Sequence, residues 1–596
     1  MNPGVTMNRP ATLPFRVLVA AWACLALAFP TASASTTDGV PNLPEIEAAG
    51  TDGQRMVPLI QRFAADLGSL QHVHDIQHGR ARHDALQALH AGWRTRLAEI
   101  PADTLDLEDR VDHLLFSREL DDRERRLAFA RQRYEEAAVL LPGIDELLDL
   151  LEQRRALVYP DGRRSADLLD RVAGTMKARR DAIEEDPSRA SDVRPVVAFR
   201  AAAILDATRN ALAQWQEFHD GYDPQLTWWT RGPHEALDAV MQDYARTLRG
   251  KLAGADDPET IIGDPIGRQA LIDDLDYEMI PYTPEELVRI AERELEWIRA
   301  EMRQAASELG YADWRDALEY VKTRHPAPGE QPRLVKELAD EAVAFLRERD
   351  LVTIPDLSTR DWRMNMLSPE RQLQAPFFLG GVDVWVAYPT ADMPHEKRVN
   401  SLRGNNRHFS RAVVHHELIP GHHLQHFMNQ RYQAHRNLFR TPFWTEGWAL
   451  YWEFRLYELG FAATPEDRIG MLFWRAHRAA RIQFSLGFHL GTMTPQQAIE
   501  LLVDNGHERE NAAAEVRRSF AGDWPAIYQA AYMLGGLQFQ ALHRDFVESG
   551  RMSERDFHDF ILQGGVMPVE MVRARLQQQA PGSDFRTSWR FYDLGR

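Results

Sequence analysis

Histidines and a glutamate gather at metal-ligand spacing in the segment Val-His-His-Glu-Leu-Ile-Pro-Gly-His-His-Leu-Gln, residues 414–425. Neutral imidazole is the commonest protein ligand for a transition metal. A glutamate directly after a ligating histidine, as Glu417 is after His416, can act as a general base on an attacking water. The types and order of these residues therefore predict a metal site with hydrolytic chemistry.

The spacing differs from the common motif His-Glu-x-x-His, in which the second histidine returns to the same helical face after four residues. Here residue 420 is proline, which cannot donate to the carbonyl of His416 and breaks a regular helix. His422 follows His416 by six residues, or about 240° around an unbroken helix. We predict that Pro420 and Gly421 form a two-residue bulge, which would bring His422 to the place of the usual second ligand.

Two other histidine pairs are weaker alternatives. His416 and His423 would lie about 10 Å apart along a helix axis. His422 and His426 have the right spacing, but no glutamate follows His422. His415, His423, His426 and His435 are interpreted as packing or supporting residues.

A third protein ligand is expected in Trp-Thr-Glu-Gly-Trp-Ala-Leu-Tyr-Trp-Glu, residues 444–453. Glu446 and Glu453 lie seven residues apart, on one face of any helix that begins after Pro442. Carboxylates on the buried side of so aromatic a helix need a partner, because an unpaired buried charge is costly. We predict that Glu446 is the ligand and that Glu453 supports a ligand or contacts a substrate amine.

These motifs, with Ala-Ala-Tyr-Met-Leu-Gly-Gly at 530–536 and Gly-Gly-Val-Met-Pro at 564–568, resemble the DUF885 family of bacterial proteins. That family is similar to gluzincin-type zinc metallopeptidases. The resemblance implies a mainly α-helical, zincin-like fold with a small β-sheet near the active site. It also implies Zn²⁺ held by His416, His422 and Glu446, with Glu417 as the catalytic base.

The developing oxyanion of such a reaction needs a donor besides the metal. Tyr532 in the 530–536 motif is the first candidate, and His489 is the second. Four arginines could bind a substrate carboxylate through paired N–H groups: Arg478, Arg481, Arg517 and Arg518.

The first 34 residues have the features of a cleavable secretory signal. Arg9 and Arg16 precede an apolar run over 17–29, and Ala-Ser-Ala at 32–34 suits a cleavage site. The run is too short for a transmembrane span. The single cysteine, Cys24, falls inside this segment, so the mature chain has no thiol and any metal must be held by nitrogen and oxygen.

We therefore expect a periplasmic or secreted protein without stable membrane insertion. Removing Arg9 and Arg16 changes the formal charge from −18 to −20, which disfavours nucleic acid as a partner. The predicted organisation is a signal peptide at 1–34, a helical region at 35–360 and a zinc-binding catalytic region at 361–596. The start at Met1 or Met7 and the oligomeric state stay open.

Helical periodicity dominates the first half, over 108–139, 164–184 and 193–219. Thr283, Pro284 and Glu286 predict a capping box, after which apolar residues recur at helical spacing as far as Gly310. Alternation over 380–388 predicts a strand. By analogy with zincins, this strand would lie over the metal and bind the substrate backbone.

The interpretation that unites these features is a zinc peptidase for short peptides, with a peptide substrate as its partner and a helical first half that limits entry. An amidase or esterase acting on a non-peptide or cell-wall substrate could use the same zinc chemistry. A non-catalytic binding protein that kept the scaffold is a further alternative, although the intact Glu417 argues against it.

Overall fold

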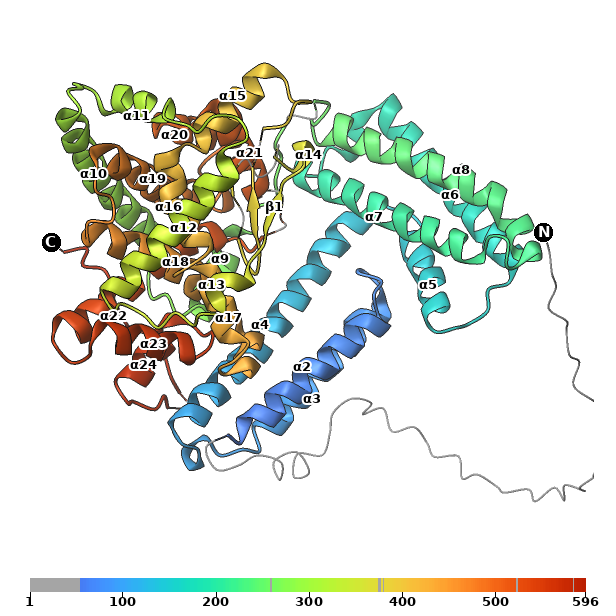
Figure 1. Ribbon diagram of the computed structural model, residues 1–596. Helices are drawn as coiled ribbons and strands as arrows, with labels where there is room; N and C mark the ends of the chain where they lie inside the picture. Colours follow the sequence, from blue (N-terminus) through green and yellow to red (C-terminus); the bar gives the residue numbers. More distant parts are fainter. Residues whose placement is uncertain are drawn as a thin grey trace, which may run out of the picture. The chain divides into compact units, whose positions relative to one another are not determined.

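The computed structural model describes residues 54–257, 260–372, 377–378, 380–387, 389–520, 522, 524–582 and 584–595 (Figure 1). The predicted signal peptide and Cys24 lie outside these residues. Helices dominate the described residues and the single sheet among them has two short strands, so the prediction of a mainly α fold is confirmed. None of the described helices is both long and apolar enough to cross a membrane.

The first half of the chain forms long amphipathic helices. Their bounds are α2 Met56–Val73, α3 Arg80–Leu97, α4 Leu107–Ala138, α5 Ile144–Arg155, α6 Gly162–Glu185, α7 Pro195–His219 and α8 Pro224–Thr247. Short 3₁₀ turns, η1 Ala102–Thr104 and η2 Pro187–Ala190, and a π turn, η3 Leu248–Leu252, join or extend them. The end of α4 and helices α5 to α8 share one apolar core, and α4, α6 and α7 agree with the predicted helices to within two residues.

A second group of helices leads to the sheet. It consists of α9 Gly267–Tyr277, α10 Pro284–Glu308, α11 Trp314–Lys322, α12 Gln331–Glu348 and α13 Ser358–Asp361. The predicted capping box of α10 is present, because Thr283 Oγ1 accepts from the Glu286 amide and Glu286 Oε2 accepts from the Thr283 amide. The predicted apolar stripe of α10 is buried and packs on α19.

The sheet pairs β1 Met364–Met366 in parallel with β2 Val384–Val386. Of the predicted strand at 380–388, only residues 384–386 form a strand, and residue 388 lies outside the described residues. Gly380 and Gly381 instead belong to the loop before β2, where they line the cavity described below. Helix α14 Pro369–Gln372 lies between the two strands in sequence, and α15 His395–Gly404 follows β2.

The last part of the chain carries the chemically interesting residues. Its elements are α16 Arg407–Glu417, α17 His422–Asn429, η4 Ala434–Phe439, α18 Pro442–Glu458, α19 Pro465–His489, α20 Pro495–Asp504, α21 Arg509–Phe520, α22 Tyr528–His543, the π turn η5 Arg544–Glu548, α23 Glu554–Gln563 and α24 Val569–Leu576.

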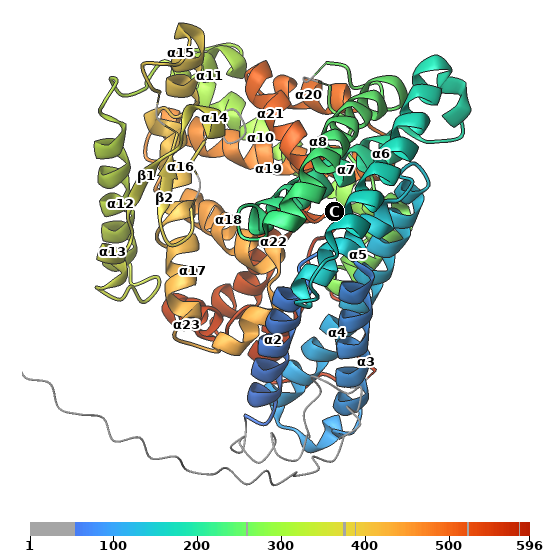
Figure 2. The same cartoon turned by 90° about the vertical axis from the view of Figure 1, so that its right-hand side faces the viewer.

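Helices α18 and α22 lie side by side (Figure 2). Two glycines allow this close approach. A Cβ on Gly447 would lie 2.6 Å from Cα of Gly535, and a Cβ on Gly535 would lie 2.1 Å from the carbonyl oxygen of Phe443. Neither position has room for a larger side chain, so the pair sets how close α22 comes to the face of α18 that carries Glu446.

The described helices belong to one compact unit, and the division at residue 360 stays a prediction about where the chemistry lies.

Candidate metal centre

The motif segment is two helices joined by a tight connection. Helix α16 ends at Glu417 and α17 begins at His422. Two hydrogen bonds cross the connection, from the Gly421 amide to the His415 carbonyl at 3.0 Å and from the Leu424 amide to the Leu418 carbonyl at 3.3 Å. Each spans six residues where a helix spans four, so two extra residues are accommodated.

The two extra residues shift the register of everything after them, so His422 occupies the place that a residue four after His416 would have in a continuous helix. His422 therefore lies where the predicted bulge would have placed it, but the backbone is not a bulge within one continuous helix. The helix stops at Glu417 and restarts at His422, directly after Gly421. Both crossing hydrogen bonds enclose Ile419 and Pro420, which are joined by a cis peptide bond.

Gly421 cannot carry a side chain in this conformation. A Cβ there would lie 1.8 Å from the carbonyl oxygen of His416 and 2.7 Å from that of His415. The connection is also tied to α18, because the indole Nε1 of Trp448 donates to the Pro420 carbonyl at 2.8 Å. The glycine and the tryptophan together fix the turn that aims His422.

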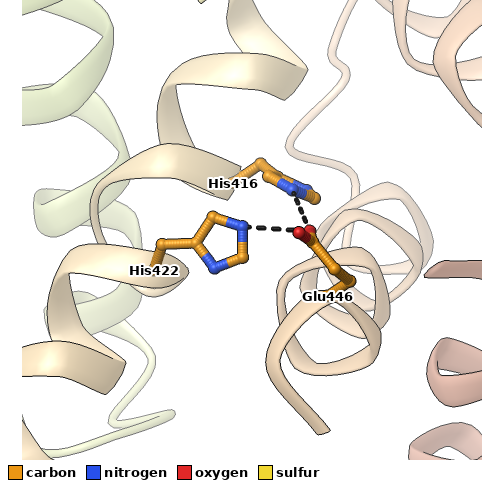
Figure 3. Close-up of side chains that lie close together, drawn as sticks. All are labelled: His416, His422 and Glu446. Carbon is orange, nitrogen blue, oxygen red and sulfur yellow. Dashed lines mark hydrogen bonds and ion pairs between the residues drawn. The ribbon is translucent and has the colours of Figure 1, made fainter. Parts of the chain in front are cut away.

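His416, His422 and Glu446 converge at this turn, and each offers one ligand atom within 4.8 Å of the others (Figure 3). Nε2 of His422 lies 3.1 Å from Oε2 of Glu446, and Nε2 of His416 lies 3.5 Å from the same oxygen. All three side chains are buried. The structure thus brings together the three residues that the sequence analysis selected as ligands.

Each histidine is held through its other ring nitrogen. Nδ1 of His416 lies 2.8 Å from Oε1 of Glu453, and Nδ1 of His422 lies 3.0 Å from Oε1 of Gln425. Because these acceptors take the proton on Nδ1, the lone pair of Nε2 faces the cluster in the neutral tautomer. Glu453 therefore has the supporting role that was one of its two predicted roles.

Gln425 and Tyr528 are supporting residues that the sequence analysis missed. The side-chain amide of Gln425 donates to the Thr445 carbonyl at 3.1 Å, which links α17 to the turn before Glu446. The hydroxyl of Tyr528 donates to Oε1 of Glu446. Gln425 is the last residue of the segment 414–425 and lies three residues after His422, so helical spacing could have identified it. Tyr528 is 82 residues from Glu446, and only the packing of α22 on α18 brings it close.

The three residues polarise one another electrostatically. Burial lowers the pKa of His422, but the Glu446 carboxylate outweighs it and raises that pKa to about 9. Burial raises the pKa of Glu446, whereas His422 and His416 together hold it well below its usual range. The Glu446 carboxylate thus faces two ring nitrogens, and its negative charge would stabilise a cation placed between these three groups.

This arrangement fits a zinc ion. Two nitrogens and one carboxylate oxygen are a usual catalytic zinc set, with bonds of about 2.0–2.2 Å. The separations of 3.1 and 3.5 Å suit two ligands of a single ion. The supporting acceptors on both Nδ1 atoms are of the kind that zinc-bound histidines use.

The cluster lies on the wall of a cavity of about 740 Å³. Glu417 lines the same cavity and is close to the loop before β2, since a Cβ on Gly380 would lie 2.0 Å from Oε2 of Glu417. Burial and Glu446 raise the pKa of Glu417 above its usual range, against the influence of the histidines. A carboxyl group with a raised pKa is better suited to accept a proton near neutral pH.

Tyr532 also reaches the cavity, as the sequence analysis expected. Its ring stacks on that of His416 with centroids 6.1 Å apart and planes at 13°. Burial and the neighbouring Glu446 raise the pKa of Tyr532 to about 12, so its hydroxyl stays protonated and can donate.

His489 does not belong to this site. It is the last residue of α19, three turns beyond Arg478, and Nδ1 accepts from the Ile266 amide at 3.4 Å. It is not among the residues that line the cavity. The expectation that His489 could stabilise an oxyanion is therefore corrected: eight residues of helix, about 12 Å, separate it from Arg481, the nearest residue of α19 that lines the cavity.

Two of the other four histidines have hydrogen-bond partners outside the cluster. His423 contacts the carbonyls of Val382 at 3.0 Å and Ser358 at 2.8 Å, and His435 bonds to Asp112 at 2.7 Å. His415 is buried outside the three-residue cluster, and His426 lines the cavity. His415, His423 and His435 thus lie in packing or supporting positions, whereas His426 faces the cavity and its supporting role stays a prediction.

Three of the four candidate arginines line the cavity: Arg478, Arg481 and Arg518. Nε of Arg481 donates to Oε1 of Glu515 at 2.7 Å, and Nη2 of Arg518 donates to the other oxygen of the same carboxylate at 3.1 Å. Arg517 is not among the lining residues.

Fold and site together define a mainly α-helical protein with a buried His-His-Glu cluster on the wall of a large cavity. The chain belongs to the DUF885 family, described as bacterial protein of unknown function, whose family model matches residues 63–576. No curated protein matches the chain.

Two solved structures were compared with this chain, and the first of them has a similar fold. One, described as a candidate lipoprotein of unknown function from Shewanella oneidensis, has a TM-score of 0.64 and 16% sequence identity, and the match covers 88% of this chain and 99% of that one. Another, described as a candidate lipoprotein from Colwellia psychrerythraea, has a TM-score of 0.49 and 20% identity, covering 71% of this chain and 76% of that one. At 16% identity, the first likeness shows the fold alone.

Proposed function

We propose that this protein is a zinc-dependent peptidase that hydrolyses short peptides. The observation that carries the proposal is the convergence of His416, His422 and Glu446 on one point, with Glu417 beside them on the cavity wall. A bound zinc ion would polarise a substrate carbonyl and make water more acidic.

The chain's own residues would perform the remaining tasks. Glu417 accepts a proton from the attacking water and delivers it to the nitrogen of the leaving amine. Its raised pKa favours this double use, because the group must take up a proton in one step and release it in the next. The loop at Gly380 covers one side of the carboxylate and limits the directions from which water approaches.

Tyr532 would donate a hydrogen bond to the carbonyl oxygen as negative charge develops on it. Its position over the His416 ring places it next to the ligand cluster. Glu453 and Gln425 keep the two ligand rings in the orientation that presents Nε2. These supporting contacts would preserve the geometry through the reaction.

Metal content and activity of two matched variants test this proposal. The mature protein should contain about one zinc per chain, bound through nitrogen and oxygen only. Glu417→Gln should keep the zinc and lose about 10³–10⁴-fold in peptidase rate, because a general base is removed while size is preserved. Glu446→Gln should instead lose zinc, because a neutral amide replaces an anionic ligand.

Zinc is measured by elemental analysis and the ligand shell by X-ray absorption, with peptide products identified by mass spectrometry. A folded protein without zinc, or a Glu417→Gln variant as active as the wild type, would refute the assignment. Loss of zinc from Glu417→Gln together with its retention in Glu446→Gln would show that the two roles are reversed.

The proposed location is outside the cytoplasm. Residues 1–34 have the composition and order of a secretory signal, and the similar protein from Shewanella oneidensis is described as a candidate lipoprotein. Expression in a bacterial host with a periplasm should yield a chain that begins at Ser35. Mass spectrometry of the mature N-terminus checks this, and a lipid-modified Cys24 would contradict cleavage after Ala34.

A further inference from the structure

Arg478 is a buried arginine on the cavity wall without a hydrogen-bonded acid. Its side chain is 6% exposed, and the nearest carboxylate oxygen, Oε1 of Glu453, lies 3.7 Å from Nη2. That distance is an ion pair but is too long for a hydrogen bond. Its Nε is also buried and has no partner within the described part of the chain.

Most oxygens of the neighbouring carboxylates are already engaged, although Oε2 of Glu453 accepts no hydrogen bond within the described part of the chain. Both oxygens of Glu515 accept hydrogen bonds from other arginines, Arg481 and Arg518. Oε1 of Glu453 lies 2.8 Å from Nδ1 of His416, so it is committed to orienting a ligand ring. The charge of Arg478 is therefore only partly compensated.

Two further observations indicate that the charge of Arg478 is not fully compensated. Arg478 and Arg481 both lie over the ring of Tyr532, at 5.3 and 4.5 Å from its centroid, so two cations share one wall of the cavity. Burial lowers the pKa of Arg478; Glu453 opposes this effect and Arg481 adds to it. A buried cation with free donors is costly unless a ligand supplies an anion.

We propose that Arg478 binds the C-terminal carboxylate of a peptide, which makes the protein an exopeptidase that removes short C-terminal fragments; this rests on the function proposed above. The guanidinium offers parallel N–H donors that match the two oxygens of a carboxylate. Arg478 is thus the specificity-determining residue, and Arg481 strengthens the local positive potential without making the contact.

The position of Arg478 limits the length of the fragment. Nη2 of Arg478 lies no more than 6.5 Å from Nδ1 of His416, since the contacts through Glu453 measure 3.7 and 2.8 Å, which add to 6.5 Å. Nδ1 faces away from the ligand cluster, so the path from Arg478 to Nε2 is longer by the width of the imidazole ring. An extended peptide advances at most about 3.3–3.6 Å per residue, so this path holds no more than about two residues. The expected leaving fragment is an amino acid or a dipeptide.

Equilibrium binding tests the carboxylate site without requiring turnover. The probes are tetra-alanine with a free C-terminus and the same peptide as its C-terminal amide, titrated by calorimetry into zinc-loaded Glu417→Gln protein. The free acid should bind about 10–100-fold more tightly, as expected for hydrogen bonds to a charged group. Adding Arg478→Gln should reduce the preference to about twofold or less.

A matched control uses Arg440, an exposed arginine that lines the same cavity. Glu417→Gln with Arg440→Gln should keep the preference for the free acid. The ratio of the affinities for free acid and amide is measured within each protein. Partial unfolding of a variant would lower the binding capacity for both peptides equally and would leave this ratio unchanged. Arg478→Lys keeps the charge but not the paired donors, and should retain only part of the preference.

Equal binding of acid and amide, binding of neither, or a preference that survives Arg478→Gln would overturn the inference. The outcome is separable from that of the proposed function. Zinc-loaded wild type that prefers the free acid but cleaves no peptide would refute the peptidase and leave the carboxylate site standing. Wild type that cleaves the free acid and the amide at equal rates would refute the carboxylate site and leave the peptidase standing.

Discussion

The two histidines proposed as ligands differ in how firmly each ring is held. His416 pairs with a buried carboxylate, Glu453, whereas His422 pairs with the neutral amide of Gln425. A carboxylate partner makes an imidazole a stronger electron donor than an amide partner does. His416 should therefore bind a zinc ion more tightly than His422 does. Arg478 reduces this difference, because its positive charge lies 3.7 Å from the same Glu453 oxygen.

Tyr532 and Tyr528 form a natural pair of test positions on α22. Tyr532→Phe should lower kcat by about 10²-fold or more, because one donor to the developing oxyanion is lost, while zinc content is unchanged. Tyr528→Phe should instead weaken zinc retention, because its hydroxyl donates to the ligand Glu446. Steady-state kinetics and elemental analysis of both proteins check the contrast. A Tyr532→Phe enzyme with wild-type kcat would exclude the assigned role.

The connection between α16 and α17 determines where the second ligand points. Its geometry depends on a residue without a side chain at 421, because a Cβ would collide with the carbonyl oxygen of His416 at 1.8 Å. The indole of Trp448 holds the same connection from α18. The geometry of the proposed metal site thus depends on two helices and the turn between them.

Gly421→Val should weaken zinc binding by about tenfold or more, because the backbone must move and carry His422 with it. Competition with a chromophoric chelator measures the affinity. Gly460→Ala, at a glycine with no neighbour within 4 Å of its would-be Cβ but with a positive φ of 80°, is the control for a purely local backbone cost. Unchanged zinc affinity in Gly421→Val would show that the close contact does not set the ligand geometry.

Helices from distant parts of the chain hold the site in place. Arg436, between α17 and α18, is fully buried and donates to Asp112 of α4 and to the carbonyl of Gly564, the C-cap of α23. Arg575 of α24 in turn donates to Glu108 of α4. The long helix of the first half is therefore fastened both to the segment between the ligands and to the end of the chain.

A buried carboxyl in the same molecule should make stability depend on pH. Glu278 accepts from the hydroxyl of Thr441, the N-cap of α18, and burial raises its pKa to about 8. Since that value is above the ordinary value of about 4.3 in an unfolded chain, the folded state binds the proton more tightly. The stabilising contribution is complete below about pH 4 and is lost as the pH rises through about 8.

Glu278→Gln imitates the protonated group at every pH. Its free energy of unfolding should therefore rise relative to wild type between pH 5 and pH 9, by an amount on the order of 3 kcal/mol. Chemical denaturation at several pH values measures the difference, and Glu185→Gln, at a side chain 74% exposed, is the surface control. A difference that stays constant or falls with pH would contradict the buried, protonated state of Glu278.

Local patterns were sufficient for much of the fold. The capping residues Thr283 and Glu286 and the apolar spacing after them predicted α10 closely, since both signals depend only on neighbours within a few residues. The strand at 380–388 was predicted too long, because alternation does not reveal where pairing with β1 begins and ends. His489 was misplaced for a related reason: helical sequence alone does not show which turn of α19 reaches the cavity.

The sequence by itself pointed to three candidate ligands, because His416 and His422 share one short motif and Glu446 is an acidic residue in an aromatic helix that needs a buried partner. Only the tertiary structure decided which groups support that set. Glu453 on His416, Tyr528 on Glu446 and the incompletely paired Arg478 result from the packing of α18, α19 and α22. Contacts between residues tens of positions apart arise from the burial of helix faces against one another, and one sequence carries no periodic signal for those pairings.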